Sequence, residues 1–173
     1  DQSVAECAIA LMLDAARHVA RCNCELRNGV WQNRVGTELS GRTLAVIGCG
    51  AIGQRVAKIA KHGFGMRVIG CDVRSVDNSD FDRIEADFGS AVAAADIVSL
   101  HLPDLPETRD YINAERLAQL GPQTSLINTA RGSVLDENAL FDAVEAGALA
   151  AAALDVFKTE PYVPQSPDKD LRS

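Results

Sequence analysis

Short apolar runs alternate with amphipathic stretches along most of this chain. Five runs predict buried strands, near 43–48, 67–71, 96–101, 124–128 and 150–155. Between them, apolar residues at helical spacing predict helices near 52–62, 88–95, 113–120 and 136–147. Strands that return in the same direction through a helix form a parallel sheet, and right-handed crossovers place helices on both of its faces. The pattern therefore predicts an α/β fold with a doubly wound parallel sheet.

The N-terminal stretch departs from this alternation. Its helical spacing predicts one long helix from residue 3 to about residue 27, carried by Val4, Ala8, Leu11, Ala15 and Val19. The helix is expected to begin at Ser3 and Glu6, which form the Ser-x-x-Glu capping pattern. Apolar side chains nearly encircle its first half, so we expect burial against its own domain and against either an absent domain or a second copy. Trp31, in the polar connector that follows, is predicted to anchor the same contact.

Composition narrows the class of protein. A chain of 173 residues with 47% hydrophobic residues can form the core of one domain. The net charge of -7 argues against a nucleic acid or an anionic membrane as partner, because phosphate groups are bound by clustered Lys and Arg. The apolar runs are far shorter than the roughly 20 residues that span a bilayer, and no secretion signal is evident, which favours a cytoplasmic protein. The five cysteines have no metal-ligand spacing, so we expect no metal.

Three glycines follow the first predicted strand. G-x-G-x-x-G alone is a weak signal, but here the helix after it and an acid 19 residues beyond the last glycine match a dinucleotide-binding loop. Gly48 permits the tight turn, Gly50 lets the backbone approach a pyrophosphate, and Gly53 lets the helix pack on the strand. The acid, Asp72, would accept hydrogen bonds from the adenosine ribose and repel a 2′-phosphate, which favours NAD over NADP. Arg74 would partly reverse that preference.

Polar residues also follow the other predicted strands, where open parallel sheets bind their ligands. Asp72, His101, Thr129 to Arg131 and Asp155 occupy these strand ends. The guanidinium of Arg131 can hold a carboxylate with two parallel hydrogen bonds, although Arg131 by itself would equally fit a surface salt bridge. Cys49, between two glycines, is interpreted as a buried inert thiol rather than a redox switch, because no basic neighbour is evident.

Five stretches of the chain, in order, resemble the D-isomer-specific 2-hydroxyacid dehydrogenases, a family that includes phosphoglycerate, formate and D-lactate dehydrogenases and hydroxypyruvate reductases. They are SVAE, GRTLAVIGCGAIGQRVA, HLPDLPETRDYIN, LINTARGSVLDENAL and AALDVFKTEP. The resemblance covers nearly the whole chain and implies a Rossmann-type NAD-binding domain. The division we expect is an interdomain and dimer helix at 1–29, a core at 43–160 and an irregular tail at 161–173. The tail is interrupted by Pro161, Pro164 and Pro167.

The resemblance also implies roles for single residues. Arg131 holds the substrate carboxylate and polarises its carbonyl, while Glu160 hydrogen-bonds a catalytic histidine and favours its proton-donating imidazolium form. Asp155 meets the nicotinamide carboxamide. The other implied contacts with the dinucleotide come from Ala51, Ile52, His101, Leu102, Pro103, Thr108, Thr129 and Ala130. Without the resemblance, Glu160 would be an ordinary exposed acid and Asp155 a turn former.

The implied reaction is hydride transfer between NAD(H) and a small 2-keto or 2-hydroxy acid. The family's catalytic histidine lies beyond the Glu-Pro pair, and the chain's three histidines, His18, His62 and His101, lie elsewhere. We therefore expect a piece of a longer protein, without its substrate domain, that binds cofactor as a homodimer and does not turn substrate over. Two alternatives stay open: an NADH-sensing protein that resembles a co-repressor, and a dehydrogenase of the same fold with another substrate such as phosphite.

Overall fold

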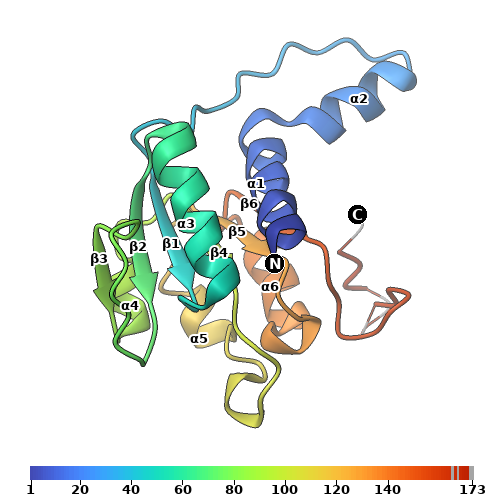
Figure 1. Ribbon diagram of the computed structural model, residues 1–173. Helices are drawn as coiled ribbons and strands as arrows, with labels where there is room; N and C mark the ends of the chain where they lie inside the picture. The colour runs from blue at the N-terminus through green and yellow to red at the C-terminus, as the bar shows by residue number, and fades with distance from the viewer. Residues whose placement is uncertain (165, 167, 172–173) are drawn as a thin grey trace.

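The computed structural model describes residues 1–164, 166 and 168–171. A six-stranded sheet in the order β3-β2-β1-β4-β5-β6 forms its centre, and all neighbouring strands are parallel (Figure 1). The strands are β1 (Thr43–Ile47), β2 (Arg67–Cys71), β3 (Arg83–Glu85), β4 (Ile97–Leu100), β5 (Ser125–Asn128) and β6 (Ala151–Leu154). The prediction of a doubly wound parallel sheet is confirmed.

Helices cover both faces of this sheet. They are α1 (Gln2–Arg17), α2 (Val19–Arg27), α3 (Ala51–Phe64), α4 (Phe88–Val92), α5 (Ala114–Leu117) and α6 (Glu137–Glu145). The helices α1 and α3 lie on one face, and α4, α5 and α6 lie on the other (Figure 1). Two 3-10 turns, η1 (Pro106–Thr108) and η2 (Gly132–Val134), lie in the loops after β4 and β5. In the described part of the chain, no helix combines the length and the apolar character needed to cross a bilayer.

The two faces of the sheet have separate apolar cores, because successive side chains of a strand point to opposite sides. In β1, Leu44 and Val46 pack with α1 and α3, while Ala45 and Ile47 pack with α4, α5 and α6. All four side chains are at most 1% exposed. Burying a side chain of Leu, Ile or Val size contributes roughly 1.5–3 kcal/mol. A strand buried on both faces reads as a continuous apolar run, which is why β1 was visible in the sequence.

The strand β3 was not predicted. It has three residues, Arg83, Ile84 and Glu85, and it pairs only with β2 at the edge of the sheet. Two charged residues in so short a segment leave no apolar run, and its position is decided by pairing with β2 rather than by burial. The other five strands overlap the predicted ranges.

The prediction of one continuous helix from 3 to 27 is wrong, although a long N-terminal helix is present. The chain breaks at His18, which adopts the left-handed conformation with φ 57°. The Asp14 side chain accepts a hydrogen bond from the Ala20 N–H at 2.6 Å and so helps to start α2. No residue of α2 is buried, so no packing holds α2 in line with α1.

The start of α1 also differs from the prediction, and within the chain only one face of the helix is buried. The helix begins at Gln2 with Asp1 as its N-cap, so Ser3 lies inside the helix and does not cap it. The buried positions are Ala5, Ala8, Ile9, Met12 and Ala16. Of the five residues whose spacing predicted the helix, only Ala8 belongs to this set. Apolar residues lie on two neighbouring faces of the helix, and either face could be buried. Packing of α1 against α3, β5 and β6 decides which one is.

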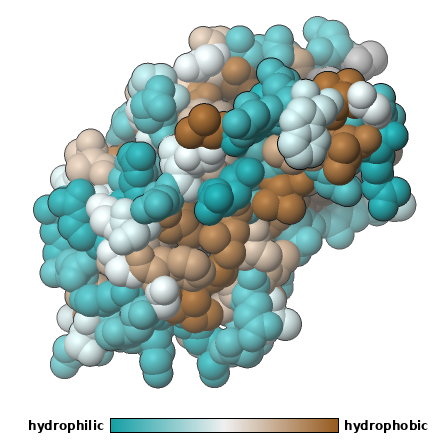
Figure 2. All heavy atoms as spheres, turned by 90° about the horizontal axis from the view of Figure 1, so that it is seen from above, coloured by the Kyte–Doolittle hydropathy of each residue, from teal (hydrophilic) through white to brown (hydrophobic). Residues whose placement is uncertain are grey.

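The segment 19–38, named here the arm, extends away from the body of the domain before the chain returns to β1 (Figure 1). Its two halves are held together by Arg34, whose Nε donates to Glu25 Oε2 at 3.0 Å. Its apolar side chains face solvent, with Trp31 85% and Val35 91% exposed. Figure 2 views the molecule from this end, where apolar residues gather between polar ones.

The C-terminal residues follow β6 without regular structure. The described residues of 161–171, which include Pro161 and Pro164, form no helix or strand. Pro167, predicted to interrupt the same tail, lies outside the described residues.

Candidate functional site

A cleft of about 920 Å³ opens at the carboxyl ends of the central strands. It lies where β1 separates β2 from β4, at the point where the order of strands reverses, and such points are the usual ligand sites of open α/β sheets. The predicted residues that line it are Gly48, Gly50, Ala51, Ile52, Asp72, His101, Leu102, Pro103, Thr108, Thr129, Ala130 and Arg131. Three predicted residues, Gly53, Asp155 and Glu160, are not part of its lining.

Two of the glycines are required by the protein's own backbone. Gly48 has φ 95°, and a Cβ at this position would lie 2.7 Å from the carbonyl oxygen of His101. A Cβ on Gly53 would overlap the carbonyl oxygen of Gly48, so Gly53 allows α3 to lie against the end of β1. Only glycine fits such positions.

Gly50 is different, because nothing in the described part of the chain requires a glycine there. Its φ of -74° and ψ of -169° are extended values that other residues adopt, and a Cβ would meet no atom within 4 Å. Gly50 lines the cleft and is the N-cap of α3, whose first amide groups have no partner within the helix. These amides and the positive end of the helix dipole form a site for an anion. The space left at Gly50 therefore fits a group that enters from the cleft.

Asp72 joins this loop to the end of β2. Its Oδ2 accepts the Cys49 N–H at 2.9 Å, and its Oδ1 accepts the Arg74 N–H at 2.9 Å. The Arg74 guanidinium also bonds both oxygens. These hydrogen bonds, led by the Arg74 side chain, lower the pKa of Asp72 below its usual value. Asp72 is therefore a carboxylate beside the glycine loop, where the sequence predicted it.

Two buried polar atoms on the cleft wall have no partner among the described residues. They are Nδ1 of His101 and Oγ1 of Thr129. The other ring nitrogen of His101, Nε2, lies 2.9 Å from Ser99 Oγ. Burial lowers the pKa of His101 to about 4, so its ring is neutral at pH 7. Unsatisfied buried polar atoms are rare in folded proteins, and a ligand with polar groups would satisfy these two.

Asn128, which the sequence analysis missed, fixes the main chain that carries Arg131. Its Nδ2 donates to the Arg131 carbonyl at 3.1 Å, and its Oδ1 accepts the Ala130 N–H at 3.0 Å. Asn128 is fully buried at the end of β5. The Arg131 side chain is exposed at the rim of the cleft, where Nη1 donates to the Ala130 carbonyl at 2.6 Å. An amide side chain at the end of an apolar run was the signal in the sequence from which Asn128 could have been found.

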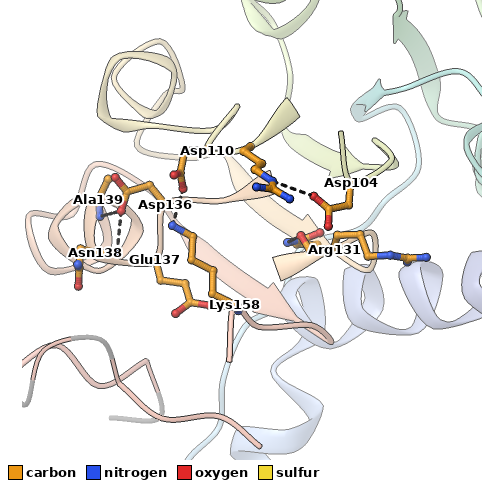
Figure 3. A network of polar contacts seen from close by, with 10 residues as sticks. Asp104, Asp110, Arg131, Asp136, Glu137, Asn138, Ala139 and Lys158 are labelled. Atoms are coloured by element: carbon orange, nitrogen blue, oxygen red, sulfur yellow. Dashed lines mark hydrogen bonds and ion pairs between the residues drawn. The ribbon is translucent and has the colours of Figure 1, made fainter. Parts of the chain in front are cut away.

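A polar network joins the loop of Arg131 to the segment after β6 (Figure 3). The Lys158 N–H donates to Glu137 Oε1 at 2.6 Å, and the Lys158 ammonium pairs with Asp110. A Cβ on Gly132 would overlap the main chain of Phe157, so the two segments are in direct contact. Three loops, after β4, β5 and β6, are thereby fastened together. Sequence analysis did not single out these residues, because each resembles an ordinary loop or cap residue in isolation.

Asp155 and Glu160 lie in the segment after β6 and are exposed. Glu160 Oε1 accepts the Phe157 N–H at 3.1 Å. Asp155 adjoins the thiol of Cys7 in α1, whose pKa is raised, first by burial and then by the Asp155 charge. Both carboxylates thus lie at one end of the sheet but outside the cleft lining.

The thiols beside the cleft are held in the protonated form. Burial raises the pKa of Cys49 to about 12 and that of Cys71 to about 11. A protonated buried thiol is a poor nucleophile, in keeping with the interpretation of Cys49 as inert. The described residues contain no group of three or more His, Cys, Asp or Glu side chains that could hold a metal ion.

The sequence as a whole places the chain among known proteins. Residues 9–172 match the family model described as D-isomer specific 2-hydroxyacid dehydrogenase, NAD binding domain. The chain belongs to this family. The resemblance read from the glycine loop and from the stretches that follow it is confirmed, although SVAE lies before the matched residues.

Individual relatives of the family agree in sequence and in fold. The chain is 43% identical over 161 residues to a hydroxypyruvate reductase of Thermotoga maritima, covering 92% of this chain and 52% of that protein. The D-lactate dehydrogenase of Aquifex aeolicus, solved with NAD and lactic acid, superposes with a TM-score of 0.82 at 35% identity, covering 91% of this chain and 48% of that one. An acyclic imino acid reductase solved with NADPH and D-Arg superposes with a TM-score of 0.85 at 30% identity, covering 94% and 53%. The chain thus spans about half the length of these relatives.

Proposed function

We propose that this chain binds NAD(H) across the cleft, with the pyrophosphate at the start of α3 and the adenosine ribose at Asp72. The observation that carries the proposal is the open space at Gly50, which adjoins Asp72 through the 2.9 Å hydrogen bond of the Cys49 N–H. Thr129 Oγ1 and His101 Nδ1 add unpartnered polar atoms on the same wall, among the described residues. When bound, the nicotinamide supplies or accepts a hydride.

NAD(H) is the proposed cofactor rather than NADP(H). Asp72 is a carboxylate with a lowered pKa at the ribose position, and its charge repels a 2′-phosphate. Arg74 opposes this preference from the rim of the cleft. The relatives include one solved with NAD and one solved with NADPH, so family membership alone favours neither.

The reaction we propose for the protein is oxidation of a 2-hydroxy acid or reduction of a 2-keto acid. Family membership supports this reaction. Arg131, exposed at the rim of the cleft, can hold the acid's carboxylate through its planar guanidinium. Glu160 is the proposed partner of a proton-donating histidine, and Asp155 the proposed contact of the carboxamide. The network of Lys158 supports this arrangement, because it fastens the segment of Glu160 to the loop of Arg131.

The histidines of this chain do not supply the proton donor. His18 lies at the junction of α1 and α2. His62 lies near the C-terminal end of α3, away from the cleft at the start of that helix, and pairs with Asp80 at 2.9 Å. His101 is partly buried and neutral at pH 7, because burial lowers its pKa to about 4. We therefore propose that the 173 residues bind cofactor without turning substrate over.

Isothermal titration of the chain with NADH tests the binding. Asp72→Asn should weaken binding by about tenfold or more, because hydrogen bonds to a charged group contribute about 1.5–3 kcal/mol. Asp82→Asn is the matched control. Asp82 also accepts a main-chain amide, that of Val68 at 2.7 Å, and pairs with a basic side chain, that of Lys61, but it lies outside the cleft. Absence of binding by the folded wild-type chain would contradict the proposal.

The second measurement follows NADH absorbance in the presence of pyruvate, glyoxylate or hydroxypyruvate. We expect no consumption of NADH above the rate without protein. Saturable turnover by the 173-residue chain would show that its own residues complete the reaction and would contradict the account of its histidines.

We further propose that the arm joins two copies of the chain into a homodimer. The arm has no buried residue in α2, is braced by the Glu25–Arg34 pair, and exposes Trp31 and Val35. In sedimentation experiments the wild type should have twice the monomer mass, and Trp31→Glu should be monomeric. Val163→Glu, at a 59% exposed valine outside the arm, should leave the dimer intact. A wild type that sediments as a monomer would refute the proposal.

A cytoplasmic location is the last part of the proposed function. All five cysteines, each within the described part of the chain, are free thiols. Reducing compartments maintain such thiols, whereas oxidising ones favour disulfides. Cell fractionation should therefore find the protein with cytoplasmic markers, and recovery with a secreted or membrane fraction would contradict this assignment.

A further inference from the structure

Both main-chain groups of Cys49, which lies between the first two glycines of the loop, are held by side chains from outside that loop. Its N–H donates to Asp72 Oδ2 at 2.9 Å, and its carbonyl oxygen accepts from Gln54 Nε2 at 3.0 Å. Gln54 belongs to α3, directly follows the third glycine, and is not part of the cleft lining. The Cys49 carbonyl is therefore held from outside the cleft.

Asn78, in the loop after β2, fixes the direction of the Gln54 amide. Asn78 Oδ1 accepts the Asp80 N–H at 2.8 Å, so the NH2 group of Asn78 faces the other way and donates to Gln54 Oε1 at 3.0 Å. The NH2 group of Gln54 is then the end that meets Cys49. An amide side chain accepts at one end and donates at the other, so neither amide can turn over without losing both of its contacts. We name these two side chains the Asn78–Gln54 bridge.

The direction of the Cys49 carbonyl decides where the next N–H points. The Cys49–Gly50 peptide bond is trans, and in a trans peptide the C=O and the following N–H point in opposite directions within one plane. The C=O is turned toward Gln54, so the Gly50 N–H is turned away from Gln54, on the side where Gly50 lines the cleft. This N–H makes no hydrogen bond to any described residue.

We propose that Gln54 and Asn78 are positioning residues that aim the Gly50 N–H at the pyrophosphate of the bound cofactor. The proposal rests on the cofactor binding proposed above. Neither side chain touches the ligand, and both act through the Cys49–Gly50 peptide. Without the bridge this peptide could turn its carbonyl oxygen to the cleft, where the oxygen would repel a phosphate. A donor that is held in place binds the anion without first having to reorient.

The variant Gln54→Met tests the bridge. Methionine keeps the length of the side chain and the helix propensity of α3, but it donates no hydrogen bond to Cys49. In isothermal titration, ADP and NADH should bind roughly three- to tenfold more weakly, because one hydrogen bond to a charged group is weakened rather than removed. Asn78→Ala should have a smaller effect, since it leaves Gln54 able to reach Cys49. The double variant should lose less ADP affinity than the product of the two single effects, because both substitutions interrupt one bridge.

Adenosine distinguishes the aiming of one N–H from a general disturbance of the cleft. It has the ribose that we place at Asp72 but no phosphate. Its dissociation constant, followed by NMR into the millimolar range, should change by less than about twofold in Gln54→Met. A general loosening of the glycine loop would instead weaken adenosine and ADP in the same proportion.

Gln2→Met is the matched control. Gln2 also lies in the first turns of a helix and uses both ends of its amide, since Nε2 donates to Glu6 at 2.9 Å and Oε1 accepts from Arg55 at 3.2 Å. It lies outside the cleft lining and has no contact with the glycine loop. The affinities for ADP, NADH and adenosine should all stay as in the wild type.

The outcomes distinguish this proposal from the proposed function. If Gln54→Met binds ADP as tightly as the wild type, or loses adenosine and ADP in the same proportion, the positioning role is overturned while cofactor binding stands. Additive effects of Gln54→Met and Asn78→Ala would overturn the bridge. If the wild type binds ADP but not adenosine, the change in ADP affinity alone decides. If the folded wild type binds neither ADP nor NADH, both proposals are overturned. Circular dichroism confirms that each variant is folded before the titrations are compared.

Discussion

Replacing Gly50 by alanine should leave the stability of the fold nearly unchanged but weaken the binding of the cofactor. The residue has φ -74° and ψ -169°, which alanine adopts, and the added methyl would meet no atom of the described residues within 4 Å. Alanine lowers the entropy of the unfolded chain and so stabilises the folded state by about 0.4–1 kcal/mol. Glycine is the better residue at the start of a helix, by roughly 0.5–1 kcal/mol. These two effects nearly cancel, so unfolding in urea should change by less than about 1 kcal/mol.

Cofactor binding should respond very differently to the same methyl group. The methyl would fill the space between the cleft and the first amides of α3, where we place the pyrophosphate. Loss of one hydrogen bond to a charged group is worth about 1.5–3 kcal/mol, which corresponds to a roughly 10- to 150-fold weaker affinity for NADH. Gly48→Ala is the contrasting variant. It should be destabilised by several kcal/mol, because φ 95° and the approach to the His101 carbonyl leave no room for a Cβ.

The measurements are urea unfolding for stability and isothermal titration for affinity, made on the same preparations. A Gly50→Ala protein that is stable and binds NADH as tightly as the wild type would refute the placement of the pyrophosphate at α3. A Gly50→Ala protein that is strongly destabilised would refute the claim that the fold does not need this glycine.

Three further predictions concern stability. Burial lowers the pKa of His101 from 6.5 to about 4 in the folded chain, so the unfolded chain takes up a proton first as the pH falls. The free energy of unfolding is therefore unaffected by this residue above pH 6.5 and decreases as the pH falls toward 4. Urea unfolding without cofactor should show a loss of about 2 kcal/mol between pH 7.5 and pH 5 that His101→Gln lacks; equal losses would contradict the assignment. Gly132→Ala should be destabilised by at least about 2 kcal/mol in thermal unfolding, because its methyl overlaps the main chain of Phe157. Gly63→Ala, in α3 with only Ile59 at 3.9 Å, should gain about 0.5–1 kcal/mol, and a lowered melting temperature would argue against that geometry.

The sheet was predictable because its inner strands are buried on both faces. Such strands leave continuous apolar runs, and the predicted ranges at β1, β2, β4 and β5 all overlap the observed strands. The edge strand β6 is only half-buried, but its four residues are all apolar, so it was predicted as well. The edge strand β3 and the break at His18 left no such mark. The first depends on pairing with a neighbour, and the second on a single left-handed residue supported by Asp14. Neither depends on the pattern of apolar positions.

The candidate site was predictable where residues follow strands and not where loops meet. Asp72, His101 and Thr129 were found from the rule that ligands bind at strand ends, and the structure gathers them on one cleft. The contacts of Lys158 with Glu137 and Asp110 join positions 21 and 48 residues apart, and no local pattern records them. Side-chain geometry between distant loops was the missing information.

The fastening of three loops by Lys158 has a consequence for how the protein can move. In the proposed reaction, Arg131 holds the acid and Glu160 partners the proton donor, so the two residues must keep a fixed spacing. Here the loop of Arg131 and the segment of Glu160 are tied as a single block by Gly132, Glu137 and Lys158. Any movement of this domain as one body would therefore carry both groups together and leave the spacing between them unchanged.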